Sequence, residues 1–233
     1  KYSTDHVTKI LFVRHGQSDA NVLGMSSSNR ETHPLTDKGR EQAKHAANIL
    51  QNETIDVVFS SPILRSRQTS DEYYSLSGKI AIVDDRIAEI QSGNWEEKPG
   101  DDLDLLASRK AYKDLSIEER YQAKRGETGE SWADVDGRVK DFLDDVLEKY
   151  KGKTILCFAH QGTDTVALKL LKGLSNEESI KTIFHNMDLV GNASIATVYV
   201  DTKTKRELDP HRPFIDEIVL EKDGKRFIRV KEV

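Results

Sequence analysis

With 233 residues, 32% of them charged and 36% hydrophobic, the chain is long enough for one large domain with a highly charged surface. Its formal net charge of -5 and the lack of a long Lys/Arg run argue against nucleic acid as a partner. No stretch approaches the ~18 apolar residues that a membrane span needs, so no membrane partner is expected either.

Apolar runs of strand length alternate with segments of helical periodicity over residues 10–171. Buried strands are predicted at 10–13, 55–59, 80–83 and 155–159. Helices are predicted at 36–50, 62–76, 135–150 and 162–171. Ser61 and Pro62 suit the start of the second helix, and Gly173 suits the end of the fourth. The alternation predicts a three-layer α/β/α fold with a mostly parallel central sheet.

A highly charged segment at 101–125 follows the third predicted strand. Ser116 and Glu119 have the spacing of a capping box, so we expect a helical insertion. Two interpretations stay open, a solvated surface excursion and a lid over a substrate site.

The pattern changes towards the C-terminus. Ser175 and Glu178 again have capping-box spacing, and residues 194–200 alternate as a strand. Asp223-Gly224 lies between two β-type runs, which predicts a C-terminal hairpin within 215–233 whose edge could pair in a homodimer. The length of the chain and the lack of an internal repeat predict a single domain over residues 1–233.

The N-terminal residues 1–8 lack the apolar core of a signal peptide, and the single cysteine, Cys157, allows no intrachain disulfide. We therefore expect a cytoplasmic protein. Because the chain begins at Lys1 rather than at Met, removal of a leader stays open.

Five polar residues follow the predicted strands. Arg14 and His15 come directly after the first strand, and His160 comes directly after the fourth. Arg65 lies in the first turn of the helix after the second strand, and Glu89 follows the third. Each alone reads as a loop or solvated residue. Since the carboxyl ends of parallel strands meet at one sheet edge, their coincidence predicts a site there.

The segments around these residues resemble the histidine phosphatase superfamily, which includes the cofactor-dependent phosphoglycerate mutases. The resemblance begins with Arg14-His15-Gly16 inside segment 11–18, and Arg-His-Gly alone would be weak. It continues in the same order through 34–39, 60–62, 65–69, 87–96, 129–131 and 158–162. The segments together cover most of residues 9 to 200, which makes the match specific.

The resemblance implies a role for each of the five residues. His15 would be the nucleophile, which must be neutral to attack phosphorus. Arg14, Arg65 and His160 would surround the phosphoryl oxygens, and their positive charge would favour neutral His15. Glu89 would be the general acid and then the base, which requires a raised pKa. Further contacts to the phosphate would come from Ser18, Asn21 and the backbone N–H of Gln161.

These roles imply phosphomonoester hydrolysis through a phosphohistidine, with a small phosphorylated substrate. No cofactor is implied, and the seven histidines show no zinc-type spacing, so no metal site is expected. The segment 91–98 departs from the pattern of the mutases, which favours a phosphatase. Two alternatives stay open: mutase-type phosphoryl transfer, and a catalytically silent module that binds a phosphorylated ligand.

Overall fold

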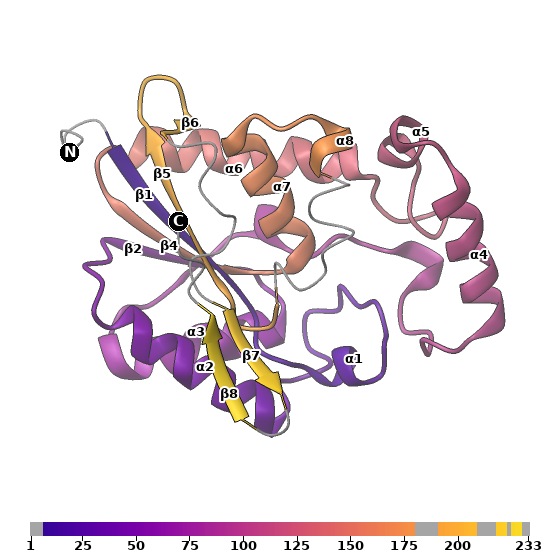
Figure 1. The fold of residues 1–233 in the computed structure, drawn as a ribbon, viewed down its shortest axis with the longest axis horizontal. Coiled ribbons are helices and arrows are strands. Elements are labelled where there is room, and N and C mark those ends of the chain that lie inside the picture. The colour runs from indigo at the N-terminus through magenta and orange to yellow at the C-terminus, as the bar shows by residue number, and fades with distance from the viewer. Residues whose placement is uncertain (1–6, 180–190, 209–217, 223–224, 230–233) are drawn as a thin grey trace.

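The structure is a computed structural model that describes residues 7–179, 191–208, 218–222 and 225–229. A six-stranded sheet forms its centre, in the order β3-β2-β4-β1-β5-β6 (Figure 1). The strands are β1 (Val7–Arg14), β2 (Val57–Ser60), β3 (Ile82–Val83), β4 (Thr154–Ala159), β5 (Ile195–Asp201) and β6 (Arg206–Glu207). Strands β1 to β4 pair in parallel, whereas β5 pairs antiparallel with β1 and β6 pairs antiparallel with β5. This confirms the predicted mostly parallel sheet.

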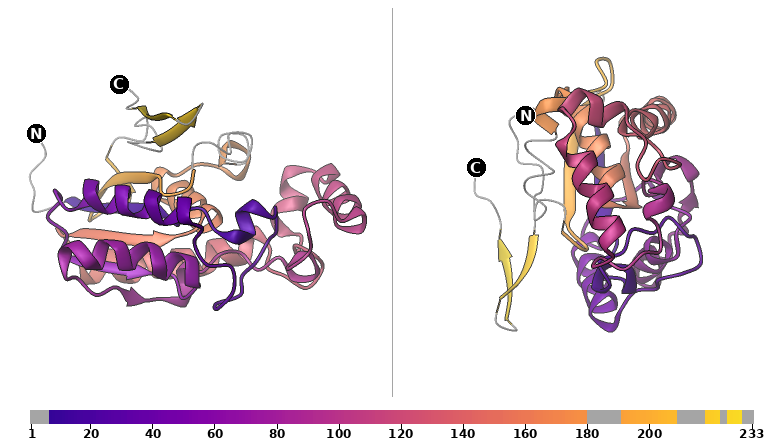
Figure 2. Two further views of the ribbon diagram at one scale, coloured as in Figure 1. Left: turned by 90° about the horizontal axis from the view of Figure 1, so that it is seen from below. Right: turned by 90° about the vertical axis from the view of Figure 1, so that its right-hand side faces the viewer.

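Helices cover both faces of the sheet, as expected for three layers (Figures 1 and 2). The pair on one face is α2 (Asp37–Leu50) and α3 (Leu64–Ser77), and the pair on the other is α6 (Trp132–Lys149) and α7 (Gln161–Lys172). Alternate side chains of β1 point to opposite faces: Ile10 and Phe12 join the core under α6 and α7, whereas Leu11 and Val13 join the core on the α2 side.

The ends of the helices follow from local sequence. Thr36 caps α2 by accepting a hydrogen bond from Gly39 N, and Ser131 caps α6 with a full capping box. Gly173 ends α7 with φ 69°, in the left-handed conformation that glycine adopts without strain, as predicted. The expected capping box of Ser175 with Glu178 precedes the short α8 (Asn176–Ser179).

The insertion after β3 is helical, as predicted. It comprises α4 (Leu103–Asp114) and α5 (Ile117–Gln122), which lie to one side of the sheet (Figure 1). The Tyr121 hydroxyl donates to Asp136 of α6 at 2.5 Å, and Lys169 of α7 bonds both residues. The insertion is therefore tied to both helices of that face.

The remaining elements are short. They are α1 (Asp19–Val22), η2 (Asp85–Ile87), η3 (Gly93–Trp95), β7 (Ile218–Lys222) and β8 (Lys225–Arg229). Strands β7 and β8 pair antiparallel, which confirms the predicted C-terminal hairpin. Its expected turn at 223–224 and its ends at 215–217 and 230–233 lie outside the described residues. No helix of the described ranges is long and apolar enough to cross a membrane.

Two predictions about single elements are wrong. The third strand is not buried: β3 has two residues at the edge of the sheet, and Ile80, Ile82 and Val83 are exposed. Helix α3 begins at Leu64, with Ile63 rather than Ser61 at the capping position. The Ser61 hydroxyl lies 2.7 Å from His160 Nε2 and accepts from Ile63 N, so it holds a turn before the helix.

Candidate active site

Strands β1 and β4 are neighbours, and each is followed directly by a histidine. Their parallel register pairs Arg14 with Ala159, and His15 N donates to Ala159 O at 3.1 Å. His15 and His160 therefore leave the sheet side by side, with ring centroids 5.1 Å apart and ring planes at 57°. Both side chains are buried, at 2% and 0% exposure. The structure thus brings the two predicted histidines into contact.

The ring of His15 is held in one orientation. Its Nδ1 lies 2.7 Å from the carbonyl oxygen of Gly16, which can only accept, so Nδ1 carries the proton. The other nitrogen, Nε2, then presents its lone pair, and Arg65 Nε donates to it at 3.1 Å. Gly16 must be glycine here because a Cβ would lie 2.3 Å from the carbonyl oxygen of Gly39.

Arg65 reaches the site from the first turn of α3. It is 4% exposed, and its Nη2 donates to Ser27 O at 2.9 Å, while its Nη1 is buried without a hydrogen-bond partner among the described residues. Ser27 is fixed in turn, because its hydroxyl donates to Glu97 at 2.5 Å. His33 Nε2 lies 2.6 Å from the other oxygen of the same carboxylate.

Both histidines favour the neutral form. Burial, followed by the positive charges of Arg65 and Arg14, lowers the pKa of His15 well below its usual range. Burial and Arg65 do the same for the pKa of His160. The Nδ1 atom of His160 is buried and has no hydrogen-bond partner in the described ranges. The site therefore contains two uncharged imidazoles beside two guanidinium groups.

Glu89 reaches the site from the loop after η2. Its side chain is half-buried, and its Oε1 accepts from Ile90 N at 2.9 Å. Its Oε2 accepts from Gly162 N in the first turn of α7, at 3.4 Å. A Cβ on Gly162 would lie 2.4 Å from Glu89 Oε1, so only glycine allows this approach. The charge of Glu89 acts on both Arg14 and Arg65, which places it among the arginines.

The three remaining predicted contacts lie at the same edge. Ser18 is fully buried, and its hydroxyl donates to Asn21 Oδ1 at 3.2 Å. Asn192, which sequence reasoning missed, donates to the same Oδ1 at 3.2 Å and to His15 O at 3.1 Å. Asn21 is exposed, and its amide is oriented by these two donors. Gln161 is the first residue of α7, directly after His160.

Arg125 is a further cation that the sequence did not single out. Its guanidinium lies 5.7 Å from the ring centres of both Trp95 and Trp132, an arrangement typical of cation–π contacts. The charges of Glu89 and Arg109 act on it, and burial lowers its pKa. The sequence gives no local sign of this arrangement, because it brings Arg125 together with a tryptophan that lies far away in the chain.

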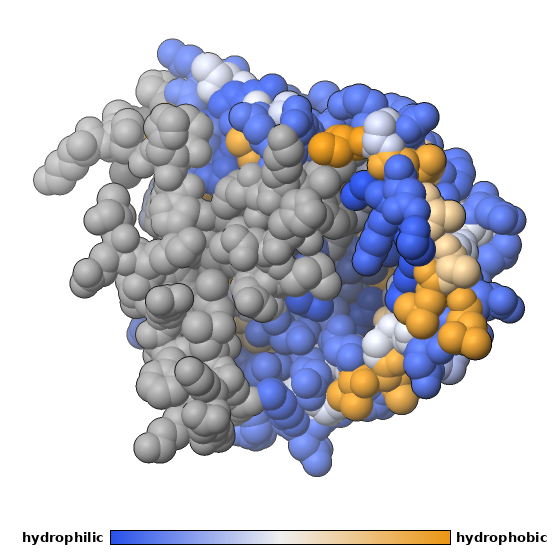
Figure 3. Space-filling view, turned by 45° about the vertical axis from the view of Figure 1, so that its right-hand side comes forward, coloured by the Kyte–Doolittle hydropathy of each residue, from blue (hydrophilic) through white to orange (hydrophobic). Residues whose placement is uncertain are grey.

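The insertion meets the loops of the site. Arg109 of α4 donates to Ser26 Oγ at 3.0 Å, and Gly100 N donates to Leu23 O at 3.3 Å. Four exposed apolar side chains lie on these segments: Val22, Leu23, Leu103 and Leu106. Figure 3 shows apolar groups on this face beside a hydrophilic surface. The insertion therefore lies beside the loops of the site, where a lid over the substrate would have to lie.

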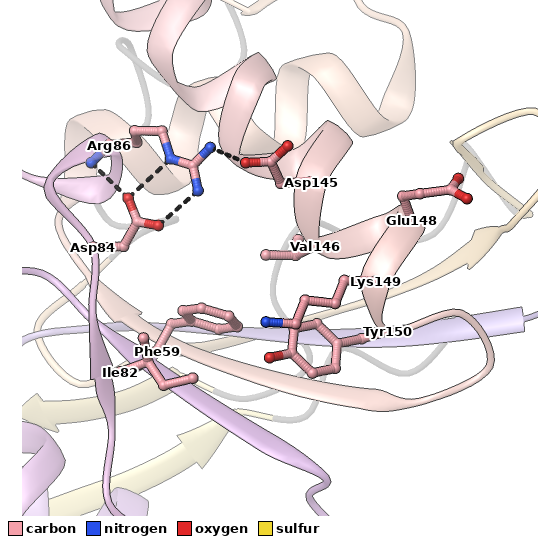
Figure 4. A pocket seen from close by; sticks show the side chains of 9 residues that line it. All are labelled: Phe59, Ile82, Asp84, Arg86, Asp145, Val146, Glu148, Lys149 and Tyr150. Carbon is pink, nitrogen blue, oxygen red and sulfur yellow. Dashed lines mark hydrogen bonds and ion pairs between the residues drawn. The ribbon is translucent and has the colours of Figure 1, made fainter.

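A separate hollow of about 440 Å³ lies at the β3 edge of the sheet (Figure 4). Arg86 spans it, with ion pairs to Asp84 and Asp145. No predicted site residue lines it, so it is distinct from the histidine site. Among the described residues, no group of three or more His, Cys, Asp or Glu side chains is arranged to hold a metal ion.

A family model described as the histidine phosphatase superfamily (branch 1) matches residues 10–207. The phosphoserine phosphatase 1 of Hydrogenobacter thermophilus is 31% identical over 156 residues, which cover 66% of this chain and 71% of that protein. A 2,3-bisphosphoglycerate-dependent phosphoglycerate mutase of Thermoplasma acidophilum is 39% identical over 83 residues, which cover 36% and 42%. The alpha-ribazole phosphatase structure from Shigella flexneri has a TM-score of 0.70 at 23% identity, covering 85% of this chain and 92% of that one.

Two uncharged histidines beside two arginines, at one edge of a three-layer α/β fold, are suited to binding an anion. With the family model matched over residues 10–207, the chain belongs to the histidine phosphatase superfamily (branch 1) and is a phosphatase of that superfamily.

Proposed function

We propose that the protein hydrolyses small phosphomonoesters without a metal, through a phosphohistidine on His15, with Glu89 as general acid and then general base. The observation that carries the proposal is the fixed ring of His15. Its Nδ1 proton is held by Gly16 O, so the lone pair of Nε2 points to Arg65 beside His160. A neutral imidazole with one oriented lone pair is the nucleophile that this chemistry requires.

The phosphoryl oxygens would lie among the donors of Arg14, Arg65 and His160. Support comes from Arg65 Nη1 and His160 Nδ1, which are buried and for which the described residues supply no partner. Charge-assisted hydrogen bonds from a guanidinium match two phosphate oxygens and stabilise charge in the transition state. Ser18, Asn21 and the backbone N–H of Gln161 would add contacts at the rim.

The reaction has two steps. First His15 Nε2 attacks phosphorus, the bond to the leaving oxygen breaks, and Glu89 gives that oxygen a proton. Then the oxygen of a water molecule attacks phosphorus, the P–N bond breaks, and Glu89 takes a proton from that water. The products are an alcohol and inorganic phosphate, and His15 is neutral again.

Hydrolysis fits better than transfer to a second substrate. The named phosphatase relative aligns over 66% of the chain, whereas the named mutase aligns over 36%. The relatives' names concern phosphoserine and alpha-ribazole phosphate, both small phosphomonoesters, and this supports a substrate of the same size.

The test is hydrolysis of p-nitrophenyl phosphate with a chelator present. We expect turnover in the wild type, and His15→Ala should lower kcat by more than about 10³-fold and remove the acid-labile phosphoenzyme. His45→Ala, in α2, is the matched control and should keep both. Turnover that survives His15→Ala would overturn the proposal.

Two substrates separate the alternatives. Release of inorganic phosphate from 3-phosphoglycerate indicates a phosphatase, and its conversion to 2-phosphoglycerate indicates a mutase. No turnover of any phosphomonoester by the folded wild type over a broad pH range would favour the binding module.

A further inference from the structure

Asp164 is a buried carboxyl group that has no role in the proposed mechanism. Its side chain is 2% exposed, and neither of its oxygens has a hydrogen-bond partner among the described residues. Its backbone N donates to His160 O at 2.8 Å, which fixes it in the first turn of α7. A carboxylate buried without donors is costly, so the neutral acid is the favoured form.

The groups that face Asp164 come from three other elements. The charge of Glu89, from the loop after η2, follows burial in raising the pKa of Asp164 well above its usual range. Arg14, at the end of β1, partly opposes both effects. The buried thiol of Cys157 on β4 also interacts with Asp164, and burial raises the pKa of this thiol so that it stays uncharged.

Glu89 has the opposite surroundings. Each of its oxygens accepts a backbone N–H, from Ile90 and from Gly162. The structure thus holds two interacting carboxyl groups, one provided with donors and one without, and Gly162 is two residues from Asp164 on α7.

We propose that Asp164 stores the proton that Glu89 delivers to the leaving oxygen. The inference rests on the proposed function and adds a positioning residue to it, because Asp164 is buried and would act through Glu89. In the resting site Asp164 is the carboxylic acid and Glu89 the carboxylate. An arriving phosphate dianion disfavours the charge of Glu89, so the proton moves from Asp164 to Glu89. Because neither oxygen of Asp164 has a hydrogen-bond partner among the described residues, this transfer passes through a water molecule between the two carboxyl groups.

The protons balance over the cycle. Glu89 gives its proton to the leaving oxygen as the P–N bond to His15 forms and the P–O bond breaks. Asp164 is then the carboxylate, and the charge of Arg14 stabilises it. In the second step one proton of the water goes through Glu89 back to Asp164, and the other stays on the released phosphate.

The experiment compares Asp164→Asn with the wild type on two substrates. For an alkyl phosphate, whose leaving oxygen needs a proton, the basic limb of the kcat profile should move about one pH unit or more to lower pH. At pH 8 this shift lowers kcat about tenfold. For p-nitrophenyl phosphate, whose leaving group needs no proton, kcat should change little. Glu89→Gln should show the same dependence on the leaving group more strongly.

Thr165→Val is the matched control, because Thr165 is the next residue of α7 and is equally buried. It should leave both pH profiles in place. If Asp164→Asn does not fold, Asp164→Ser removes the same titrating group with a smaller side chain. Basic limbs that superimpose for variant and wild type, or equal losses on both substrates, would overturn the inference.

An infrared measurement separates this inference from the proposed function. The wild type minus Asp164→Asn difference spectrum at pH 7 should contain the C=O stretch of a protonated carboxylic acid. A carboxylate band in its place would show that Asp164 is ionised at pH 7. That result would overturn the inference about Asp164 even if His15 proves to be the nucleophile. A wild type without turnover defeats the proposed function and, with it, the role of Asp164, whatever the infrared spectrum shows.

Discussion

The two buried histidines make the stability of the protein depend on pH. Their pKa values in the folded state are lowered, so between about pH 6.5 and the folded values the unfolded chain binds more protons. The contribution of the neutral histidines to the free energy of unfolding is therefore fully present above about pH 6.5. It decreases as the pH falls, by up to about 1.4 kcal/mol per histidine and pH unit. Asp164, with a raised pKa, has the opposite sign.

Thermal unfolding of the wild type and of His160→Gln between pH 7 and pH 5 measures this contribution. The midpoint temperature of the wild type should fall over this range. In the variant the fall should be smaller, because one of the two buried imidazoles no longer has to remain neutral. Equal slopes for the two proteins would show that His160 is not held neutral in the fold.

The sequence predicted which side chains meet at this edge, but not how they are held. Arg14, His15 and His160 follow apolar runs directly, so their place at the strand ends can be read from the chain. The bonds of Ser61 to His160 and of Ser27 to Arg65 join residues 99 and 38 positions apart. Asp164 lies inside a helix, where its burial depends on tertiary packing and no local pattern marks it.

At the scale of elements, the first turn of α7 determines where Glu89 can lie. Gly162→Ala would place a Cβ 2.4 Å from Glu89 Oε1 and 3.4 Å from Ile90 Cγ2, so the carboxyl group must move. We expect kcat for an alkyl phosphate to fall about tenfold or more. The free energy of unfolding should change little or rise, since alanine favours a helix over glycine by about 1 kcal/mol.

Gly137→Ala in α6 is the control for that prediction, because a Cβ there meets nothing within 4 Å. It should stabilise the protein with unchanged kcat. If Gly162→Ala behaves in the same way, then Glu89 does not depend on the close approach to α7.

Elements with a strong hydrophobic periodicity could be predicted from the sequence. Elements whose position depends on contacts with other strands or helices could not. Helix α6 has a continuous apolar stripe, from which the sequence predicted a helix at 135–150. Its capping box at Ser131 was not predicted, and the helix begins earlier, at Trp132. Strand β3 is apolar in sequence but exposed, because it pairs on one side only, with β2. The capping position of α3 was mispredicted because Ser61 bonds His160, the residue that follows β4.

At the scale of the whole molecule, we propose that the sheet, its helices and the insertion form one domain. Tyr121 of α5 shares contacts with Asp136 and Lys169, and Trp95 packs edge-on against Tyr112 of α4 at 5.3 Å. Contacts on this scale couple the unfolding of the insertion to that of the core.

The two tryptophans of the chain test this coupling, since Trp95 and Trp132 flank the insertion. Urea unfolding followed by tryptophan fluorescence should coincide with unfolding followed by far-UV circular dichroism. A fluorescence transition at lower urea concentration would instead show that the insertion opens before the sheet.

The contact between Arg65 and His15 has a consequence for the proposed mechanism. The lone pair of His15 that would attack phosphorus is engaged in the resting site, because Arg65 Nε donates to it. Without substrate, His15 Nε2 is therefore occupied by this hydrogen bond and is not available to a neutral electrophile. An anion is a stronger, charged acceptor for the guanidinium of Arg65, so its binding would break the hydrogen bond to Nε2. Binding of the phosphate to Arg65 would therefore free His15 Nε2 at the same time, so that the negative charge of the substrate activates the nucleophile that attacks it.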